Sequence, residues 1–245
     1  LHLYGHSFPT RRSSDLSIQL NKDNDYLEGT ICVDLENVKL WDNHNPYLYH
    51  AYVELKAEDG SLAEVIPYDI GFRRIEIIDK IIYLNGKRLI ITGVNRHEWN
   101  AKTGRCIGIE DMKADISCLL RNNINSVRTC HYPDQIPWYY MCDNAGIYVM
   151  AETNLESHGS FQKLGAIEPS CNVPGSFPQW KGAVIDRAKN NFETFKNHTS
   201  IVSITHSITY MLPLILASSS ARVLIVTLRH STSSIAPADA NHIYV

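Results

Sequence analysis

The stretch that decides the fold spans residues 125–150 and reads NSVRTCHYPDQIPWYYMCDNAGIYVM. It predicts a short strand that ends in Arg128 and His131, a helix that Gly146 closes, and a second apolar strand. Polar groups just past the carboxyl end of a buried strand are how (β/α)₈ barrels build their binding sites. The stretch therefore predicts one unit of such a barrel, with its functional groups after the first strand.

Similar units flank this stretch. A helix before residue 126 is indicated by an apolar stripe with helical spacing, formed by Met112, Ile116, Leu119 and Leu120. A later helix is indicated by Val184, Ile185, Ala188, Phe192 and Phe195. Strands are expected at residues 89–92, 126–129, 147–151 and 200–203. Alternating strands and helices favour a parallel sheet, and four units amount to half of an eightfold barrel.

The region before the barrel has a different pattern. Apolar and polar residues alternate in residues 31–36 and 49–56, which is the period of half-buried strands. Turn residues at 58–60 lead into a further strand. We expect an antiparallel β-sandwich over residues 17–74. Asn85-Gly86 then predicts a tight hairpin turn close to the start of a barrel domain at residues 75–203.

The two ends of the chain lack the patterns of the middle. Residues 1–16 show no sustained period, and their sequence is similar to translated sequencing adapter. An artefact or an ordinary mobile terminus would explain them. After Glu193 the only acidic residue is Asp239, while Ser/Thr clusters alternate with short apolar runs. We therefore expect residues 204–245 to be a frameshifted or chimeric tail, and both ends to be poorly packed.

Composition excludes several classes of protein. The net charge is −3 and the pI is about 6.4, which provides no basic field for nucleic acid or anionic lipid. No apolar run is long enough to span a bilayer. The six cysteines are scattered without a CxxC pair, which argues against a structural zinc site and fits a reducing compartment. We expect a cytoplasmic protein that binds neither nucleic acid nor membrane.

Three motifs carry a resemblance to a known family: GVNRHE at residues 93–98, RTCHYP at 128–133 and ETNLESHG at 152–159. Together they resemble glycoside hydrolase family 2, nearest to its β-galactosidases. The resemblance implies an immunoglobulin-like β-sandwich followed by a partial TIM barrel. It also implies a retaining exo-β-galactosidase, commonly homo-oligomeric, that hydrolyses terminal β-D-galactosyl residues of lactose-like substrates. A β-glucuronidase or β-mannosidase of the same family, or a non-catalytic carbohydrate-binding protein, are the alternatives.

The resemblance assigns roles to four side chains, and two further side chains are expected to support them. His97 and His131 match positions that hydrogen-bond the galactosyl unit, a role that suits imidazole because it donates or accepts hydrogen bonds. Glu156 and His158 match ligands of the family's magnesium ion; without the resemblance they are an ordinary surface pair. Arg128 is expected to orient a carboxylate, or to form a structural ion pair. Glu152 is expected to be an acid behind the groups that contact the ligand.

No catalytic carboxylate is assigned. Retaining glycosidases need two, about 5 Å apart. In the family the acid/base glutamate follows strand four within a Trp-[Ser/Gly]-x-x-Asn-Glu pattern. Residues 195–202 match the approach to this pattern, but residues 203–208 read SITHSI and no Asn-Glu follows. We therefore expect a fragment that lacks both catalytic glutamates, does not hydrolyse β-galactosides at an enzymatic rate, and binds Mg²⁺ weakly or not at all.

Overall fold

The structure is a computed structural model. It describes the backbone of residues 2–5, 16–17, 21–23, 26–34, 37–57, 59–156, 174, 177–205 and 223–231, and side chains within 37–57, 59–156, 174 and 177–205. The chain divides into two compact units. The first comprises Leu1–Trp41, Tyr47–Arg74 and Ser218–Val245, and the second Asp42–Pro46 and Ile75–Ala217. The expected boundary near residue 74 coincides with this division.

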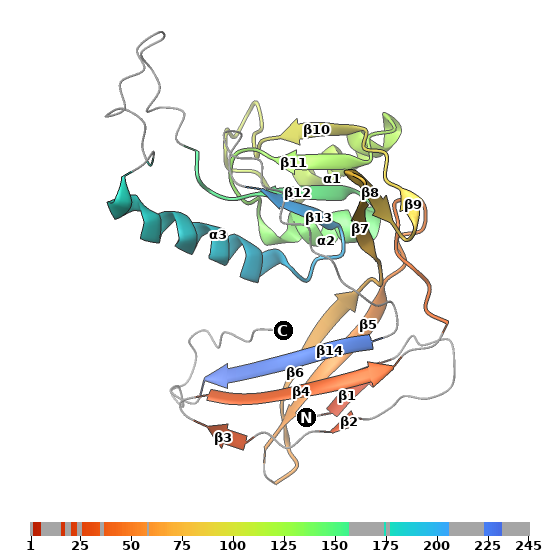
Figure 1. The fold of residues 1–245 in the computed structure, drawn as a ribbon, viewed down its shortest axis with the longest axis vertical. Coiled ribbons are helices and arrows are strands. Elements are labelled where there is room, and N and C mark those ends of the chain that lie inside the picture. Colours follow the sequence, from red (N-terminus) through yellow and green to blue (C-terminus); the bar gives the residue numbers. More distant parts are fainter. Residues whose placement is uncertain are drawn as a thin grey trace. The chain divides into compact units, whose positions relative to one another are not determined.

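The first unit contains two antiparallel sheets (Figure 1). One has the strand order β2-β1-β5-β6, and the other β14-β4-β3. Their bounds are β1 His2–Gly5, β2 Leu16–Ser17, β3 Asn21–Asp23, β4 Tyr26–Asp34, β5 Tyr49–Lys56, β6 Leu62–Ile70 and β14 Val223–Ser231. In β5, the buried side chains Tyr49, Ala51 and Val53 alternate with more exposed neighbours, as the period of two predicts.

Both ends of the chain contribute strands to these sheets, which differs from the expectation that neither end would pack. At the amino end β1 pairs with β2 and β5, and near the carboxyl end β14 pairs along the whole of β4. Backbone pairing can form wherever an extended segment meets an open strand edge. Such pairing requires no coherent apolar face in the sequence of the segment. The side-chain burial of β1 and β14 lies outside the described residues.

The second unit begins with an antiparallel sheet formed by β7 (Ile75–Ile78), β8 (Ile81–Leu84) and β9 (Lys87–Arg88). The turn between β8 and β9 is Asn85-Gly86, as expected, and φ is +52° at Asn85 and +77° at Gly86. Two successive positive φ values define the hairpin turn whose twist matches its flanking strands. Asn and Gly are the residues that tolerate this geometry best.

A four-stranded parallel sheet follows, with the strands in sequence order (Figure 1). Its strands are β10 Gly93–Arg96, β11 Ser126–Thr129, β12 Tyr148–Glu152 and β13 Ile201–Thr205. The connections contain α1 Ile109–Arg121, α2 Ile136–Ala145, the 3₁₀ turn η3 Pro178–Trp180 and α3 Lys181–Phe195. The predicted partial α/β barrel is therefore confirmed, because all three strand pairs are parallel.

One strand lies later than expected. Strand one was predicted at residues 89–92, but the structure has it at Gly93–Arg96. The prediction relied on the apolar residues Ile90 and Ile91, but both side chains are exposed. The backbone there is held instead by the Asn125 side chain, which accepts from the Thr92 N–H and donates to the Ile90 carbonyl. The shift places His97 directly after the strand.

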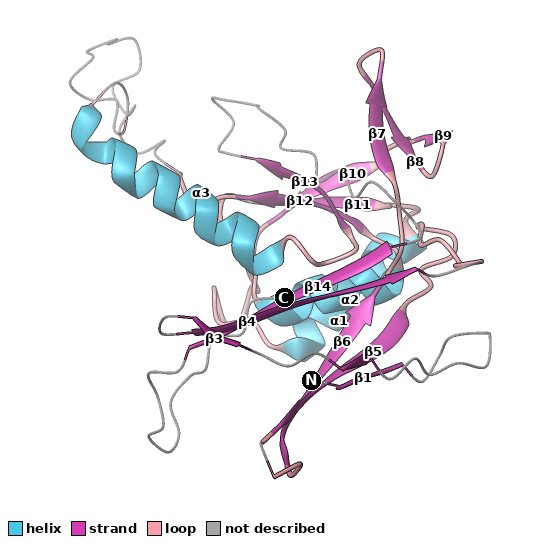
Figure 2. Cartoon of the chain, turned by 60° about the horizontal axis from the view of Figure 1, so that its bottom comes forward, coloured by secondary structure: helices cyan, strands magenta, loops and turns pink. Residues whose placement is uncertain are grey.

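The core of this unit is formed by side chains from the parallel sheet and its helices, whose backbones Figure 2 draws in magenta and cyan. It includes Met112, Leu119, Val127, Trp138, Tyr139, Cys142, Ile147, Val149, Ala151, Phe195, Ile201 and Ile204. Leu120 and Ile185, which were also expected on inward faces, are about half exposed. Within the described residues, no helix has the combined length and apolar character that a bilayer span requires.

Candidate functional site

The carboxyl ends of three neighbouring strands hold most of the expected site residues. His97 follows β10, His131 lies two residues after β11, and Glu152 ends β12. Parallel strands all point the same way, so these residues meet at one edge of the sheet. The strand order β10-β11-β12 places His131 in the middle.

Strand alternation divides the side chains between the two faces of the sheet. Val127, Val149 and Ala151 join the helix-packed core. Arg128 is adjacent to Val127, so its side chain points to the opposite face. Arg128 is in register with Met150, and Glu152 lies two residues further along the same face of β12. The sheet register therefore brings the Arg128 guanidinium to the Glu152 carboxylate.

Glu152 is the buried anion of the site. Its side chain is fully buried, and Oε2 lies 2.5 Å from Arg128 Nη2. Its other oxygen, Oε1, lies 3.1 Å from His131 Nδ1. The backbone at this point is fixed by a hydrogen bond of 2.9 Å from the Glu152 N–H to Thr129 Oγ1. A buried carboxylate needs such compensation because an isolated charge is expensive to remove from water.

His131 connects this buried pair to the more exposed groups. Its Nδ1 lies 3.5 Å from Glu156 Oε2, and 34% of the Glu156 side chain is exposed. The His131 and His97 rings meet edge to face, with centroids 5.5 Å apart. The pKa of His97 is lowered by desolvation and by the neighbouring charges of His131, Arg105 and Arg128. A lowered pKa keeps His97 neutral near pH 7, so its ring can donate or accept hydrogen bonds.

Arg96, the last residue of β10, connects the site to the neighbouring helices. Its Nη1 donates to Asp134 Oδ2 at 2.7 Å and its Nε donates to Asp115 Oδ2 at 3.0 Å. The guanidinium also lies 3.7 Å from the ring centroid of Trp138. Burial raises the pKa of Asp134 to about 7, although Arg96 acts against this. Arg96 therefore ties the ends of β10 and β11 to helices α1 and α2.

Two groups of side chains have ligand atoms close enough to share a metal ion. His131, Glu152 and Glu156 form one, and His97, Cys130 and His131 form the other, each with its ligand atoms within 4.8 Å of one another. The expected magnesium pair was Glu156 with His158. Glu156 belongs to the first group, whereas His158 lies outside the described residues.

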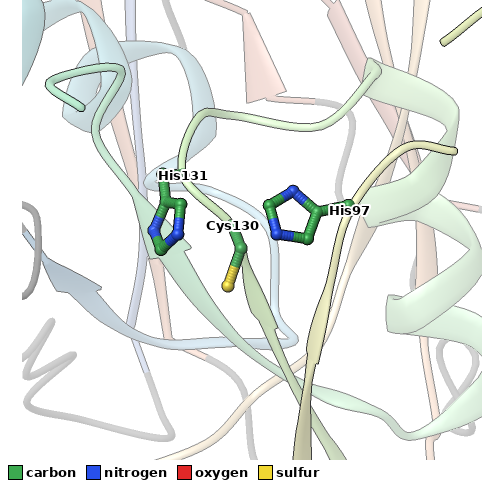
Figure 3. Close-up of side chains that lie close together, drawn as sticks. All are labelled: His97, Cys130 and His131. Carbon is green, nitrogen blue, oxygen red and sulfur yellow. The ribbon is translucent and has the colours of Figure 1, made fainter. Parts of the chain in front are cut away.

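The sequence interpretation missed Cys130. In Figure 3 this side chain lies between the imidazoles of His97 and His131. Burial raises the pKa of the Cys130 thiol, and Arg128 Nη1, 3.3 Å from Sγ, opposes that shift. The adjacent Cys-His pair in the RTCHYP motif was the available signal. It was overlooked because metal-binding cysteines were sought only as CxxC pairs.

Comparison with known proteins matches most of the chain to one family. The family model described as "Glycosyl hydrolases family 2, TIM barrel domain" matches residues 75–208. The model described as "Glycosyl hydrolases family 2" matches residues 7–73, starting within the segment expected to be an artefact. The β-glucuronidase from Ruminococcus gnavus in complex with C6-substituted uronic isofagomine superimposes with a TM-score of 0.60 at 22% identity, covering 75% of this chain and 32% of that one. At that identity the likeness shows the fold alone.

Curated relatives are much closer in sequence. The chain is 69% identical over 169 residues to the β-galactosidase large subunit of Lactobacillus acidophilus. It is 67% identical over 168 residues to the β-galactosidase large subunit of Lactobacillus helveticus. These matches cover 69% and 68% of this chain, which spans 27% of the length of each relative. The two family models and the parallel α/β sheet agree, and the chain belongs to the glycosyl hydrolases of family 2.

Proposed function

We propose that the carboxyl edge of β10–β12 is part of the sugar-binding pocket of a retaining exo-β-galactosidase that hydrolyses terminal β-D-galactosyl residues. The proposal rests on one observation. His97 and Glu156 both lie beside His131, and His131 in turn contacts the buried Arg128–Glu152 pair. Relatives at 67–69% identity named β-galactosidase favour the galactosyl unit over glucuronic acid or mannose.

Each side chain has a task that suits its environment. His97 is neutral and exposed, so it can hydrogen-bond a sugar hydroxyl while open to the ligand. Glu152 contacts Nδ1 of His131, which leaves the other nitrogen of the His131 ring for the sugar. The Arg128 guanidinium forms an ion pair with the buried Glu152 carboxylate. The buried pair thus positions the imidazoles without needing to contact the sugar.

Glu152 and Glu156 do not form a catalytic pair, although their oxygens come within 4.8 Å. Catalysis needs one carboxylate to reach the anomeric carbon and the other to reach the leaving oxygen. Glu152 is fully buried and bound to Arg128, so the substrate cannot reach it. We therefore assign no catalytic carboxylate among the described residues and expect this chain not to hydrolyse a chromogenic β-galactoside.

A magnesium ion fits the group His131, Glu152 and Glu156 only in part. Two carboxylates are suitable oxygen ligands for a hard cation. However, Arg128 already neutralises Glu152, which leaves Glu156 as the main anionic ligand in this group. Bound magnesium would supply positive charge and ordered water beside the sugar hydroxyls. We expect weak binding, held mainly by Glu156 together with His158.

Assembly and location are further parts of the proposal. The relatives are named as large subunits, which favours a companion polypeptide, and the family's homo-oligomers are the alternative. The described cysteines Cys106, Cys118, Cys130 and Cys142 are all free thiols, consistent with a reducing cytoplasm. Size measurement of the chain alone and with cell extract from a producing strain would distinguish these assemblies.

The test is calorimetric titration with a non-hydrolysable β-thiogalactoside and, separately, the matching β-thioglucuronide. We expect the galactoside to bind and the glucuronide not to bind. His97→Phe should weaken galactoside binding by roughly 5-fold, since a hydrogen bond is worth ~1 kcal/mol. His44→Phe, at an exposed histidine on the opposite edge, is the matched control and should change nothing. Equal binding of both sugars, or an unchanged affinity in His97→Phe, would contradict the proposal.

A further inference from the structure

We propose that His97, Cys130 and His131 form a binding site for a soft divalent cation such as Zn²⁺, distinct from the oxygen-ligand site around Glu156. The three side chains supply two imidazole nitrogens and one sulfur, with ligand atoms within 4.8 Å of one another (Figure 3). Zinc prefers nitrogen and sulfur ligands, whereas magnesium requires oxygen. The donor set therefore selects a different metal from the one that the carboxylates would hold.

Zinc binding would require the three ligand atoms to move only slightly closer together. Zn–N bonds of 2.0–2.1 Å and Zn–S bonds of 2.3 Å in a tetrahedral site place the ligand atoms roughly 3.3–3.6 Å apart. The present separations all lie within 4.8 Å and therefore exceed the required ones by at most about 1.5 Å. His97 is exposed, so a change in its side-chain torsions can supply this movement while Cys130 stays in the protein interior. A water molecule would complete the fourth position.

The neighbouring charges are compatible with a metal ion. Glu152 Oε1 lies 3.1 Å from His131 Nδ1, which is the arrangement of a carboxylate that orients a metal-bound histidine. With a proton on Nδ1 shared with Glu152, the other ring nitrogen of His131 has its lone pair available. Arg128 is close to both Cys130 and His131, but its charge is compensated by Glu152.

Binding is a ligand exchange in which no group is oxidised or reduced. The hydrated zinc ion loses water as two neutral imidazoles and the sulfur bind. The Cys130 thiol releases its proton to solvent, since a coordinating thiol is deprotonated by the metal. The ion would occupy both imidazoles that the proposed function assigns to the sugar. Competition with galactoside therefore rests on that function, whereas metal binding does not.

Cobalt(II) is the probe, because it replaces zinc in such sites and its thiolate complexes absorb in the near ultraviolet. Adding Co²⁺ to the protein should produce a sulfur-to-cobalt band that a slight excess of Zn²⁺ removes. Cys130→Ser and His97→Ala should both abolish the band. Cys106→Ser, at an exposed cysteine outside the group, should retain it. His97→Ala at an exposed position also guards against loss of the band through misfolding.

Zinc affinity provides the second readout. Loss of one ligand should weaken Zn²⁺ binding by more than ~10-fold, because removal of a partner outside the coordination sphere already costs 10–100-fold. Glu156→Gln should leave the band and the zinc affinity unchanged. A band that survives Cys130→Ser, or one that depends on Glu156, would overturn the site. A band that forms as expected while zinc leaves thiogalactoside binding intact would uphold the site and refute the sugar role of the histidines.

Discussion

The two edges of the parallel sheet β10–β13 are built in different ways. At the carboxyl edge lie charged and titratable side chains, several of them partly exposed, such as His131 and Glu156. At the amino edge neutral groups tie the strands together. Asn125 bonds through its side chain to the Thr92 N–H and the Ile90 carbonyl, and through its backbone to Tyr148. In barrels the amino edge serves stability and the carboxyl edge serves function.

The amino edge also contains a cavity of about 480 Å³, lined by residues that include Asn43, Lys87, Arg88, Asn123 and Tyr148. Its lining includes Asp42 and His44, but the groups of metal-binding side chains found among the described residues all lie at the carboxyl edge. We therefore place the proposed binding site by the grouping of its side chains, and not by the presence of a cavity.

The largest expected effect is at the amino edge, from Gly146→Ala. Gly146 ends α2 with φ +71°, and an added Cβ would lie 2.8 Å from the Asn43 carbonyl oxygen. The left-handed conformation costs ~1–2 kcal/mol and the close contact a further ~1–3 kcal/mol, so we expect a loss of about 4 kcal/mol. Urea unfolding measures it.

The control is Gly182→Ala in α3, where an added Cβ meets nothing within 4 Å. Alanine should stabilise that helix by about 0.5–1 kcal/mol. If both substitutions had the same effect, the account of the amino edge as tightly built would be wrong.

The carboxyl edge should make stability depend on pH. Burial raises the pKa of Asp134 from 3.8 to about 7. Between these values the folded protein keeps a proton that the unfolded chain has released, so stability falls as pH rises from about 4 to 7. The loss should reach up to about 3 kcal/mol across this window. Unfolding at several pH values should show this slope in the native protein and a smaller one in Asp134→Asn; equal slopes would contradict it.

Asn125→Ala tests the ties across the amino edge. It removes the side-chain hydrogen bonds to Thr92 and Ile90, and we expect a loss of about 1–2 kcal/mol. Asn144→Ala is the matched control, because Asn144 is exposed and its side chain donates to the Tyr140 carbonyl within its own helix. Thermal unfolding of both variants gives the comparison, and an equal loss in each would show that Asn125 has no special role.

The smallest effect on stability is expected from His97→Ala at the carboxyl edge. This exposed side chain has an edge contact with His131, and its removal should change the unfolding free energy by less than about 0.5 kcal/mol. Its galactoside affinity should nevertheless fall. A large loss of stability would mean that His97 is a structural residue, and would contradict the difference proposed between the two edges of the sheet.

Much of the fold was predictable because strong local signals agree with it. The Gly146 stop, the Asn85-Gly86 turn and the apolar strand of residues 147–151 each needed only neighbouring residues. Strand one was misplaced because Ile90 and Ile91 have the composition of a buried strand but are exposed. Their position depends on hydrogen bonds to Asn125, more than thirty positions away, which local patterns do not contain.

The site was predictable in part. Its histidines and glutamates follow strands, and the family motifs point to them. The Arg128–Glu152 pair depends on the register between β11 and β12, which the sequence does not state. Cys130 was not predicted as a site residue, because it joins a group of metal-binding side chains only when β10 places His97 beside it. Contacts between strands therefore account for what the sequence interpretation lacked.

The most direct test of the central claim is an NMR titration of the isotope-labelled chain with a β-thiogalactoside. Signals of His97, His131 and Glu156 at the carboxyl edge should shift as the sugar binds. Signals of Asn125 and Gly146 at the amino edge should remain in place. Shifts centred on Asn125 and the amino-edge cavity, with His97 and His131 unchanged, would contradict the claim that the carboxyl edge binds the sugar.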